Sequence, residues 1–337
     1  MTKETALAKA SGGALATAAD VERVKEAART YAAAAKATNT RAAYATATEH
    51  FEAWCARFGQ DPWTAGPETI VAYLSDLASN GAAWNTVALH RAALSVRFTL
   101  LGRQSPTRDP RVREVMAGIR RASPAPGQRA PLTLDLLPVV LTSISTAWVP
   151  AVFWRARAII LLGVATALRG EQIAALRFEQ MRKAEGGISI RIGKEKTDQL
   201  GKGRVVYVPR IGGPLCPCAA LEEWIGYAKI TAGPVFRGFR RGHHPSAKAI
   251  TRREVWQIVK SAAKEAGLDP TDFGAHSLRA GFVTSARARG MDWGEIMRQT
   301  GHKRIDTVLK YDRPAEDDPA AFARLAKMMK GGGNGEA

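Results

Sequence analysis

The sequence predicts a mainly α-helical protein of two domains, and three observations lead to this fold class. Apolar residues recur at helical spacing over most of the 337 residues, one stretch alternates as a β-hairpin does, and one proline-rich basic segment divides the chain. We therefore expect an all-α N-terminal domain, followed by a mostly helical domain with a small antiparallel β-sheet or hairpin. A chain of this length is comfortable for two domains.

The N-terminal domain is expected to span residues 26–122, after a disordered tail over residues 1–25 that is rich in Ala, Gly, Thr and Ser. Its first helix should bury a stripe that runs from Tyr44 through Phe51 to Phe58. Four stretches carry the helical pattern: "TNTRAAYATATEHFEAWCARFG", "GPETIVAYLSDLASNG", "WNTVALHRAALSVRFTLLG" and "DPRVREVMAGIRR". We expect no strand in this domain.

A linker is predicted over residues 123–132, because Pro124, Pro126 and Pro131 forbid a continuous helix there. The C-terminal domain then covers residues 133–316. Its apolar run "AIILLGVATAL" suits a buried helix, and "GISIRIG" and "RVVYVP" form a hairpin from about 187 to 209. Further helices are expected near Cys218, Thr251, His276, Asp292 and Ile305. Residues 317–337 hold a short amphipathic helix and a glycine-rich tail.

The formal net charge of +18 indicates a polyanionic partner, and nucleic acid fits it best. No apolar run is long enough for a membrane span, no secretory signal is visible, and no basic amphipathic anchor favours a membrane surface. We expect a cytosolic protein. Three cysteines give no disulfide framework, and the lone Cys216-Pro-Cys218 makes a metal site improbable. We expect neither a metal nor another cofactor.

Six residues of chemical interest follow one another along the C-terminal domain. Each is ordinary when taken alone. An arginine after an apolar helix usually marks the solvent-exposed end of that helix, and a lysine in a charged turn is usually a surface residue. The joint pattern and its order carry far more weight than any single member. The six are Arg169 in "ATALRGEQIAALR", Lys196 in "GKEKTDQ", His276 and Arg279 in "GAHSLRAGF", and His302 and Tyr311 in "TGHKRIDTVLKY".

This pattern resembles that of the tyrosine recombinases, the phage integrase family of lambda integrase and Cre. The six residues match the family's arginine, hairpin lysine, H-x-x-R, histidine and tyrosine in order and spacing. The resemblance implies a core-binding domain, a linker and a catalytic domain that close on DNA as a C-shaped clamp. One departure is Gln172, where the family usually carries an acid, and this puts the local hydrogen bonding in doubt.

The resemblance also implies a chemistry that suits these side chains. Arg169, Arg279 and His302 would stabilise the charge on a pentacoordinate phosphate. Tyr311 would be the nucleophile, and His276 would be its base or the group that positions it. Lys196 would protonate the departing 5′-oxygen. The 3′-phosphotyrosine intermediate retains the bond energy, so rejoining needs neither ATP nor metal.

Contacts with DNA are expected from both domains. The helix that begins in "TRREVWQIV" is implied to enter the major groove, with Arg252 as the first base-reading residue and Arg253 as the second. In the N-terminal domain the candidates for phosphate or base contacts are Arg41, Asn85, Thr86 and Arg91.

Three functions remain open at this point. The favoured one is a site-specific recombinase of a bacterial mobile element, free as a monomer and assembled as a homotetramer on two specific duplex sites. A type IB topoisomerase or a catalytically silent DNA-binding regulator are the alternatives. The residues do not reveal the target sequence, the direction of exchange or the accessory factors.

Overall fold

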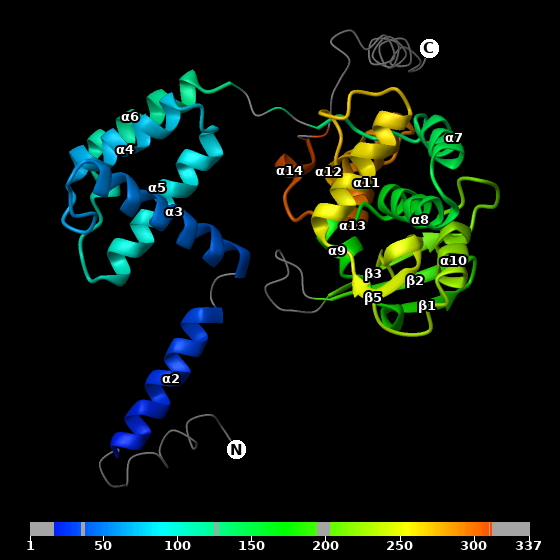
Figure 1. Cartoon of the computed structure of the whole chain (residues 1–337), viewed down its shortest axis with the longest axis horizontal. Coiled ribbons are helices and arrows are strands. Elements are labelled where there is room, and N and C mark those ends of the chain that lie inside the picture. Colours follow the sequence, from blue (N-terminus) through cyan, green and yellow to red (C-terminus); the bar gives the residue numbers. More distant parts are fainter. Residues whose placement is uncertain are drawn as a thin grey trace, which may run out of the picture. The chain divides into compact units, whose positions relative to one another are not determined.

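The computed structural model describes residues 17–34, 38–124, 127, 129–193, 203–309 and 311. The chain divides into two compact units, Met1–Pro126 and Gly127–Ala337 (Figure 1). The point of division falls inside the segment predicted to be a linker. No helix in the described ranges is both long and apolar enough to cross a membrane.

The described residues of the first unit form helices joined by turns and irregular segments, with no strand. Its elements are α2 (Ala18–Ala34), α3 (Thr38–Arg57), α4 (Pro67–Ser79), α5 (Trp84–Leu100), the 3-10 turn η1 (Pro106–Arg108) and α6 (Pro110–Ala122). The prediction of a disordered tail to residue 25 is wrong from Ala18 onward. Asp20 and Thr17 bond reciprocally at the start of α2, and Ala, Glu, Lys and Arg, which favour helices, follow them.

The core of the first unit lies between α3, α4, α5 and α6, where apolar side chains form one buried cluster. The cluster contains Phe51, Trp54, Cys55, Ile70, Tyr73, Leu74, Val87, Leu94, Phe98, Val112 and Met116. Burial of Phe58 was predicted and is wrong, since its side chain is 55% exposed. Because α3 ends at Arg57, Phe58 leaves the buried stripe and packs its ring on Trp54 instead.

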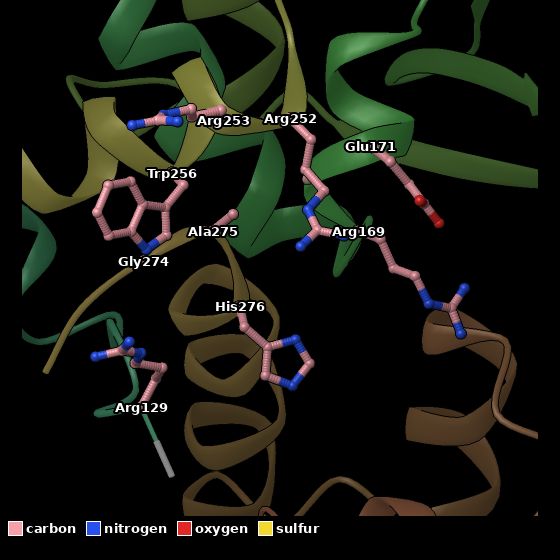
Figure 2. A pocket seen from close by; sticks show the side chains of 10 residues that line it. Arg129, Arg169, Glu171, Arg252, Arg253, Trp256, Gly274, Ala275 and His276 are labelled. Atoms are coloured by element: carbon pink, nitrogen blue, oxygen red, sulfur yellow. The ribbon is translucent and has the colours of Figure 1, made fainter. Parts of the chain in front are cut away.

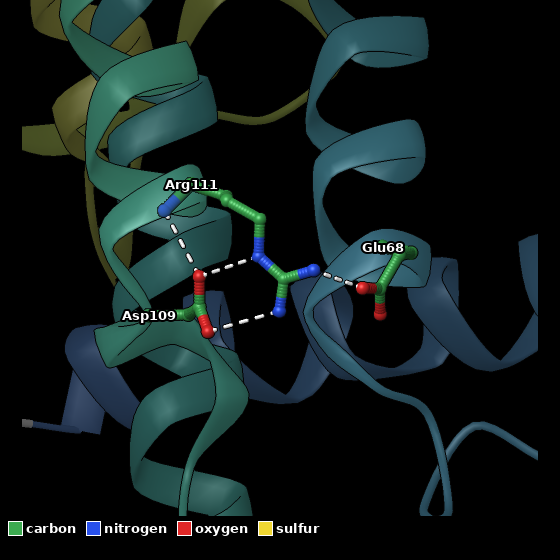
Figure 3. Close-up of polar contacts among 3 residues, drawn as sticks. All are labelled: Glu68, Asp109 and Arg111. Atoms are coloured by element: carbon green, nitrogen blue, oxygen red, sulfur yellow. Dashed lines mark hydrogen bonds and ion pairs between the residues drawn. The ribbon is translucent and has the colours of Figure 1, made fainter.

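The start of α6 is fixed by the N-cap Asp109, which ties α6 to α4 (Figure 3). Its carboxylate accepts the backbone N–H of Arg111 at 2.9 Å and two bonds from the Arg111 guanidinium at 2.9 and 3.1 Å. The same guanidinium bonds Glu68 on α4. These bonds hold the pKa of the Asp109 carboxyl below its usual value. The ion pair therefore links the first turn of α6 to the first turn of α4.

The second unit holds the remaining helices and both sheets. Its helices are α7 (Leu137–Ala147), α8 (Pro150–Thr166), α9 (Gly170–Ala174), α10 (Pro217–Tyr227), α11 (Arg252–Glu265), α12 (Ala275–Ala288), α13 (Trp293–Thr300) and α14 (Ile305–Leu309), with 3-10 turns η2 (Phe178–Gln180) and η3 (Arg241–His243). Its strands are β1 (Met181–Ala184), β2 (Gly187–Ile192), β3 (Arg204–Pro209), β4 (Arg237–Phe239) and β5 (Pro245–Ala249).

The predicted hairpin is present as β2 and β3, which pair antiparallel from Gly187↔Pro209 to Ile192↔Arg204. The structure adds β1 on the other edge of β2 and a separate two-stranded sheet of β4 and β5. The sequence did not predict these three strands. They have three to five residues each, and none carries the apolar alternation that marks β2 and β3.

Helix α8 is the centre of the second unit. It packs against α7, α10, α11, α12 and β3, and nearly all of its length is buried, as its apolar sequence predicts (Figure 1). The segment after residue 127 is held onto this unit by backbone bonds from Ala130 N to Asp272 O at 2.7 Å and from Leu132 N to Ser277 O at 2.9 Å. Part of the predicted linker therefore belongs to the second unit.

Gly281 on α12 permits this close approach, and its replacement by alanine is expected to destabilise the second unit. A Cβ atom at Gly281 would lie 1.9 Å from the carbonyl oxygen of Leu132, so the backbone would have to move. We expect Gly281→Ala to lose about 1–3 kcal/mol of unfolding free energy. Gly226→Ala on α10 is the matched control, because its Cβ would meet nothing within 4 Å. Urea unfolding that finds the two variants equally stable would contradict the close contact.

Candidate active site

The turn between α8 and α9 positions the first arginine of the pattern. Ala167 adopts a left-handed conformation, with φ of 53°, and the chain then turns so that Arg169 precedes α9 as its N-cap. This conformation is uncommon for a residue with a Cβ, and here Ala167 is fully buried. The turn also presents the Ala167 carbonyl oxygen to α12.

Helix α12 places His276 and Arg279 three residues apart on one face, as predicted. The Arg279 side chain is 1% exposed, and its Nη1 donates to the Ala167 carbonyl oxygen at 2.7 Å. The end of α8 thus holds a buried guanidinium in place, because a carbonyl oxygen at the helix terminus accepts a hydrogen bond from it.

The end of α13 brings His302 back to the same place. Gly301 follows α13 with φ of 73°, a left-handed conformation that glycine adopts without strain. The His302 Nε2 then lies 2.8 Å from Arg279 Nη2, and its Nδ1 lies 2.7 Å from Thr300 Oγ1. His302 is therefore fixed from two sides by neighbouring side chains.

Tyr311 completes the group. Its phenol oxygen lies 2.6 Å from His276 Nε2, and its ring packs beside Val283, Ile296 and Val308 of a small apolar cluster. The ring centroids of His302 and Tyr311 are 6.0 Å apart. The structure therefore brings together the arginine, histidine and tyrosine residues that the sequence predicts, although they come from segments more than a hundred residues apart.

The pKa shifts at the site follow from burial and from an excess of positive charge. Burial raises the pKa of the Tyr311 phenol, an effect that the Arg279 cation offsets in part. His276 has an exposed side, yet the protein around its ring and the charges of Arg279 and Arg169 lower its pKa. Burial and the same arginines lower the pKa of His302 to about 3. Burial lowers the pKa of Arg279 to about 10, so it stays charged at neutral pH.

A neutral His276 beside charged arginines suits both proton transfer to His276 and the binding of an anion. A neutral His276 can accept the phenol proton across the 2.6 Å contact. Arg169 and Arg279 bring two cations close enough for their charges to interact, and a guanidinium pairs well with a phosphate anion. Among the described residues, no group of three or more His, Cys, Asp or Glu side chains is arranged to hold a metal ion.

A cavity of about 570 Å³ opens beside His276, and Figure 2 shows its lining. Residues at the starts of α9, α11 and α12 all contribute to its wall. The side chains that define its character are Arg129, Arg169, Arg252, Arg253, Trp256 and His276. The cationic side chains of its wall suit the binding of anionic groups such as phosphate.

Comparison with known proteins decides the family. The model described as "Phage integrase family" matches residues 145–317. An integrase/recombinase XerD homolog of Selenomonas ruminantium is 34% identical over 281 residues, which are 82% of each chain. The chain belongs to the phage integrase family. It is a tyrosine recombinase.

A further relative and two solved structures are also similar to this tyrosine recombinase. The recombinase Cre of Escherichia phage P1 is 23% identical over 81% of this chain and 83% of its own. The fold matches the Tn1549 transposon integrase in complex with transposon right end DNA, with a TM-score of 0.63 at 15% identity over 90% of this chain and 98% of that one. It also matches a lambda integrase dimer bound to a COC′ core site, with a TM-score of 0.57 at 15% identity over 94% and 85%.

The local hydrogen bonding that the sequence left in doubt at Gln172 is present in this tyrosine recombinase. The Gln172 Oε1 accepts the backbone N–H of Arg169 at 2.8 Å, which caps α9. A side-chain carbonyl oxygen accepts this bond as a carboxylate oxygen would. Gln172 therefore orients the Arg169 backbone without adding a negative charge to the site.

The predicted DNA-contacting residues lie on both units. Arg252 and Arg253 are exposed on the first turn of α11 and line the cavity, as Figure 2 shows. In the first unit Arg41 is exposed on α3, while α5 carries exposed Asn85 and Thr86 in its first turn and half-buried Arg91 further on. The contacts of these residues with DNA remain predictions.

Two further predictions fall outside the described residues, namely Lys196 and the helix within residues 317–337. Sequence reasoning in turn missed Arg129, Trp256 and Thr300. Trp256 follows Arg253 by three residues, so helical spacing alone could have placed both on one face. Thr300 stands two residues before His302, but no spacing rule indicates the bond between them.

Proposed function

We propose that this tyrosine recombinase performs site-specific recombination through a 3′-phosphotyrosine intermediate, with Tyr311 as the nucleophile. The observation that carries the proposal is the 2.6 Å contact between the Tyr311 phenol oxygen and His276 Nε2, beside the buried Arg279. A nucleophile, its base and an anion-binding group are thus adjacent, which is the arrangement that attack on a phosphodiester requires.

The roles follow from the chemistry of each group. His276 takes the phenol proton, and Tyr311 attacks the phosphorus while the bond to the 5′-oxygen breaks. Arg169 and Arg279 donate to the non-bridging oxygens, which gain charge in the transition state. His302 lies within reach of the same oxygens. Reversal by a 5′-hydroxyl of another strand rejoins the DNA and regenerates Tyr311.

Lys196→Ala is expected to slow cleavage, because we propose that Lys196 protonates the departing 5′-oxygen. A substrate with a 5′-bridging phosphorothiolate should restore most of the lost rate, since sulfur leaves without a proton. The measurement is single-turnover cleavage of the oxygen and sulfur substrates by both proteins. If sulfur restores nothing, another group is the general acid.

Incubation with supercoiled plasmid, followed by denaturation, tests the proposal as a whole. Covalent adducts restricted to particular sites support a recombinase. Relaxation that is independent of sequence would indicate a type IB topoisomerase, and the absence of any adduct on any DNA would indicate a regulator. DNA that flanks the gene is the first substrate to try, because inverted repeats there would suggest the recombination site.

We also propose how the protein assembles. The positive charge and the basic cavity favour the binding of duplex DNA, with Arg252 and Arg253 as the first base-reading residues. A monomer in solution would form a homotetramer on two sites, with the segment after residue 317 docked on a neighbouring copy. The place of action would be the bacterial cytosol and nucleoid.

A further inference from the structure

Two hydrogen bonds of Thr300 determine which ring nitrogen of His302 carries a proton. The fully buried Thr300 hydroxyl lies 2.7 Å from the Ile296 carbonyl oxygen and 2.7 Å from His302 Nδ1. A hydroxyl has one proton to donate, and a carbonyl oxygen can only accept. The Thr300 hydroxyl therefore donates to the Ile296 carbonyl oxygen, and its oxygen accepts a hydrogen bond from the Nδ1–H group of His302. His302 is the Nδ1–H tautomer.

The other nitrogen of the ring is an acceptor. Arg279 Nη2 lies 2.8 Å from His302 Nε2, and a guanidinium only donates, so Nε2 holds a lone pair. The 3.3 Å separation between Nη2 and Nδ1 is not a second bond, because Nδ1 already carries a proton. Burial and the surrounding charges, which lower the pKa of His302 to about 3, agree with a neutral ring.

This tautomer has a consequence for a bound phosphate. Non-bridging phosphate oxygens accept hydrogen bonds, and so does the Nε2 of this neutral ring. The two groups can therefore bond only after Nε2 gains a proton and the ring becomes an imidazolium. A phosphate anion favours that change, because its charge opposes the cations that keep the ring neutral. Those cations and the other titratable groups that face the ring are Arg279, His276, Arg169, Arg204 and Tyr311.

We propose that Thr300 is a positioning residue that holds the proton of His302 on Nδ1, so that His302 donates to the scissile phosphate only after it takes up one proton from solvent when DNA binds. This inference rests on the proposed function, because it assigns His302 to the phosphate. It adds a step that the catalytic pattern itself does not contain. The balance is one proton from solvent to Nε2. The hydrogen bond from Arg279 Nη2 to Nε2 breaks as that guanidinium turns to the phosphate, and no bond to Nδ1 breaks.

Removal of the Thr300 hydroxyl should abolish the need for this proton. In Thr300→Val the side chain keeps its shape but no longer accepts from Nδ1. Once a bound phosphate draws the Arg279 guanidinium away from Nε2, the neutral ring can then carry its proton on Nε2 and donate to the phosphate directly. Thr300→Ser is the matched control, since it retains the hydroxyl and loses only a methyl group. We expect Thr300→Ser to behave as the wild type does.

Proton uptake on DNA binding is the first measurement. Calorimetric titration with a short duplex that the protein selects from a random-sequence library, repeated at one pH in buffers of different ionisation enthalpy, counts the protons bound. The wild type and Thr300→Ser should take up about one proton more than Thr300→Val. Equal uptake by all three proteins would overturn the proposal.

The pH profile of single-turnover cleavage gives a second measurement. A group that must be protonated acts below its pKa, so the wild-type rate should fall about tenfold per pH unit above the pKa of His302 in the complex. Thr300→Val should lack this decline. A decline that is the same in Thr300→Val and in the wild type would count against Thr300 as the cause.

The tautomer itself can be observed without any DNA, by nitrogen NMR of the wild type labelled at histidine, with His302→Gln to assign the signal. The proposal requires a proton on Nδ1 and none on Nε2, and the reverse would overturn it. Because this result does not depend on cleavage, it tests the tautomer of His302 separately from the proposed recombinase function. If no protein forms adducts with DNA, the proposed function fails while the tautomer is still determined.

Discussion

Tyr311→Phe is expected to abolish covalent attachment to DNA, with a loss of at least about 10⁴-fold in cleavage, because the variant lacks the attacking oxygen. Binding should change little, since it depends on cationic contacts that are spread over both units. The ring can keep its packing against Val283, Ile296 and Val308, so the fold should persist. Denaturing electrophoresis of the DNA adduct and a gel-shift titration measure the two properties separately.

A second tyrosine serves as the control for this experiment. Tyr227 stands on α10 in the same unit, is 46% exposed, and stacks on Trp224. Tyr227→Phe removes the same atom away from the site and should cleave as the wild type does. Adduct formation by Tyr311→Phe at the wild-type rate would show that another residue is the nucleophile.

Arg279→Lys is expected to have the second largest effect, a loss of about 10²- to 10³-fold in cleavage. Lysine keeps the charge, but its single ammonium cannot reach Ala167 and His302 and also present the planar pair of donors that matches two phosphate oxygens. The Ala167 carbonyl is then left without its buried donor, so the unfolding temperature of the second unit should also fall.

The control for Arg279→Lys lies on the same helix. Arg287 is two turns further along α12, where its guanidinium lies over the Trp293 ring and its Nη1 donates to the Met291 carbonyl oxygen. Arg287→Lys makes the same chemical change outside the site and should leave cleavage nearly intact. If both variants cleave equally well, the planar donors of Arg279 are not used in the transition state.

The architecture could be predicted from the sequence wherever a local pattern was long enough. The helices from α3 to α6 and the pairing of β2 with β3 follow from period and turn composition, and the family pattern named the residues of the site. The prediction failed at Phe58 because burial there depends on where α3 ends. It failed at β1, β4 and β5 because strands of three to five residues are stabilised by their partners and not by their own sequence.

The contacts that hold the site could not be predicted. The left-handed turn at Ala167, the bond from Thr300 to His302 and the cap formed by Gln172 each join groups whose approach is set by tertiary packing. A spacing rule can name His276 and Arg279 as neighbours on a helix. It does not show that Arg279 is buried, or that an alanine carbonyl is its partner.

The last turn of α8 links the core of the second unit to the candidate active site. The carbonyl oxygens of Ala165 and Ala167 accept hydrogen bonds from Gln299 Nε2 at 3.1 Å and from Arg279 Nη1 at 2.7 Å. Most of the remaining residues of α8 are buried in the core of the unit. Even a small displacement of this helix would move the guanidinium that we propose binds the scissile phosphate. We therefore expect substitutions in the last turn of α8 to lower the rate of cleavage before they lower the stability of the unit.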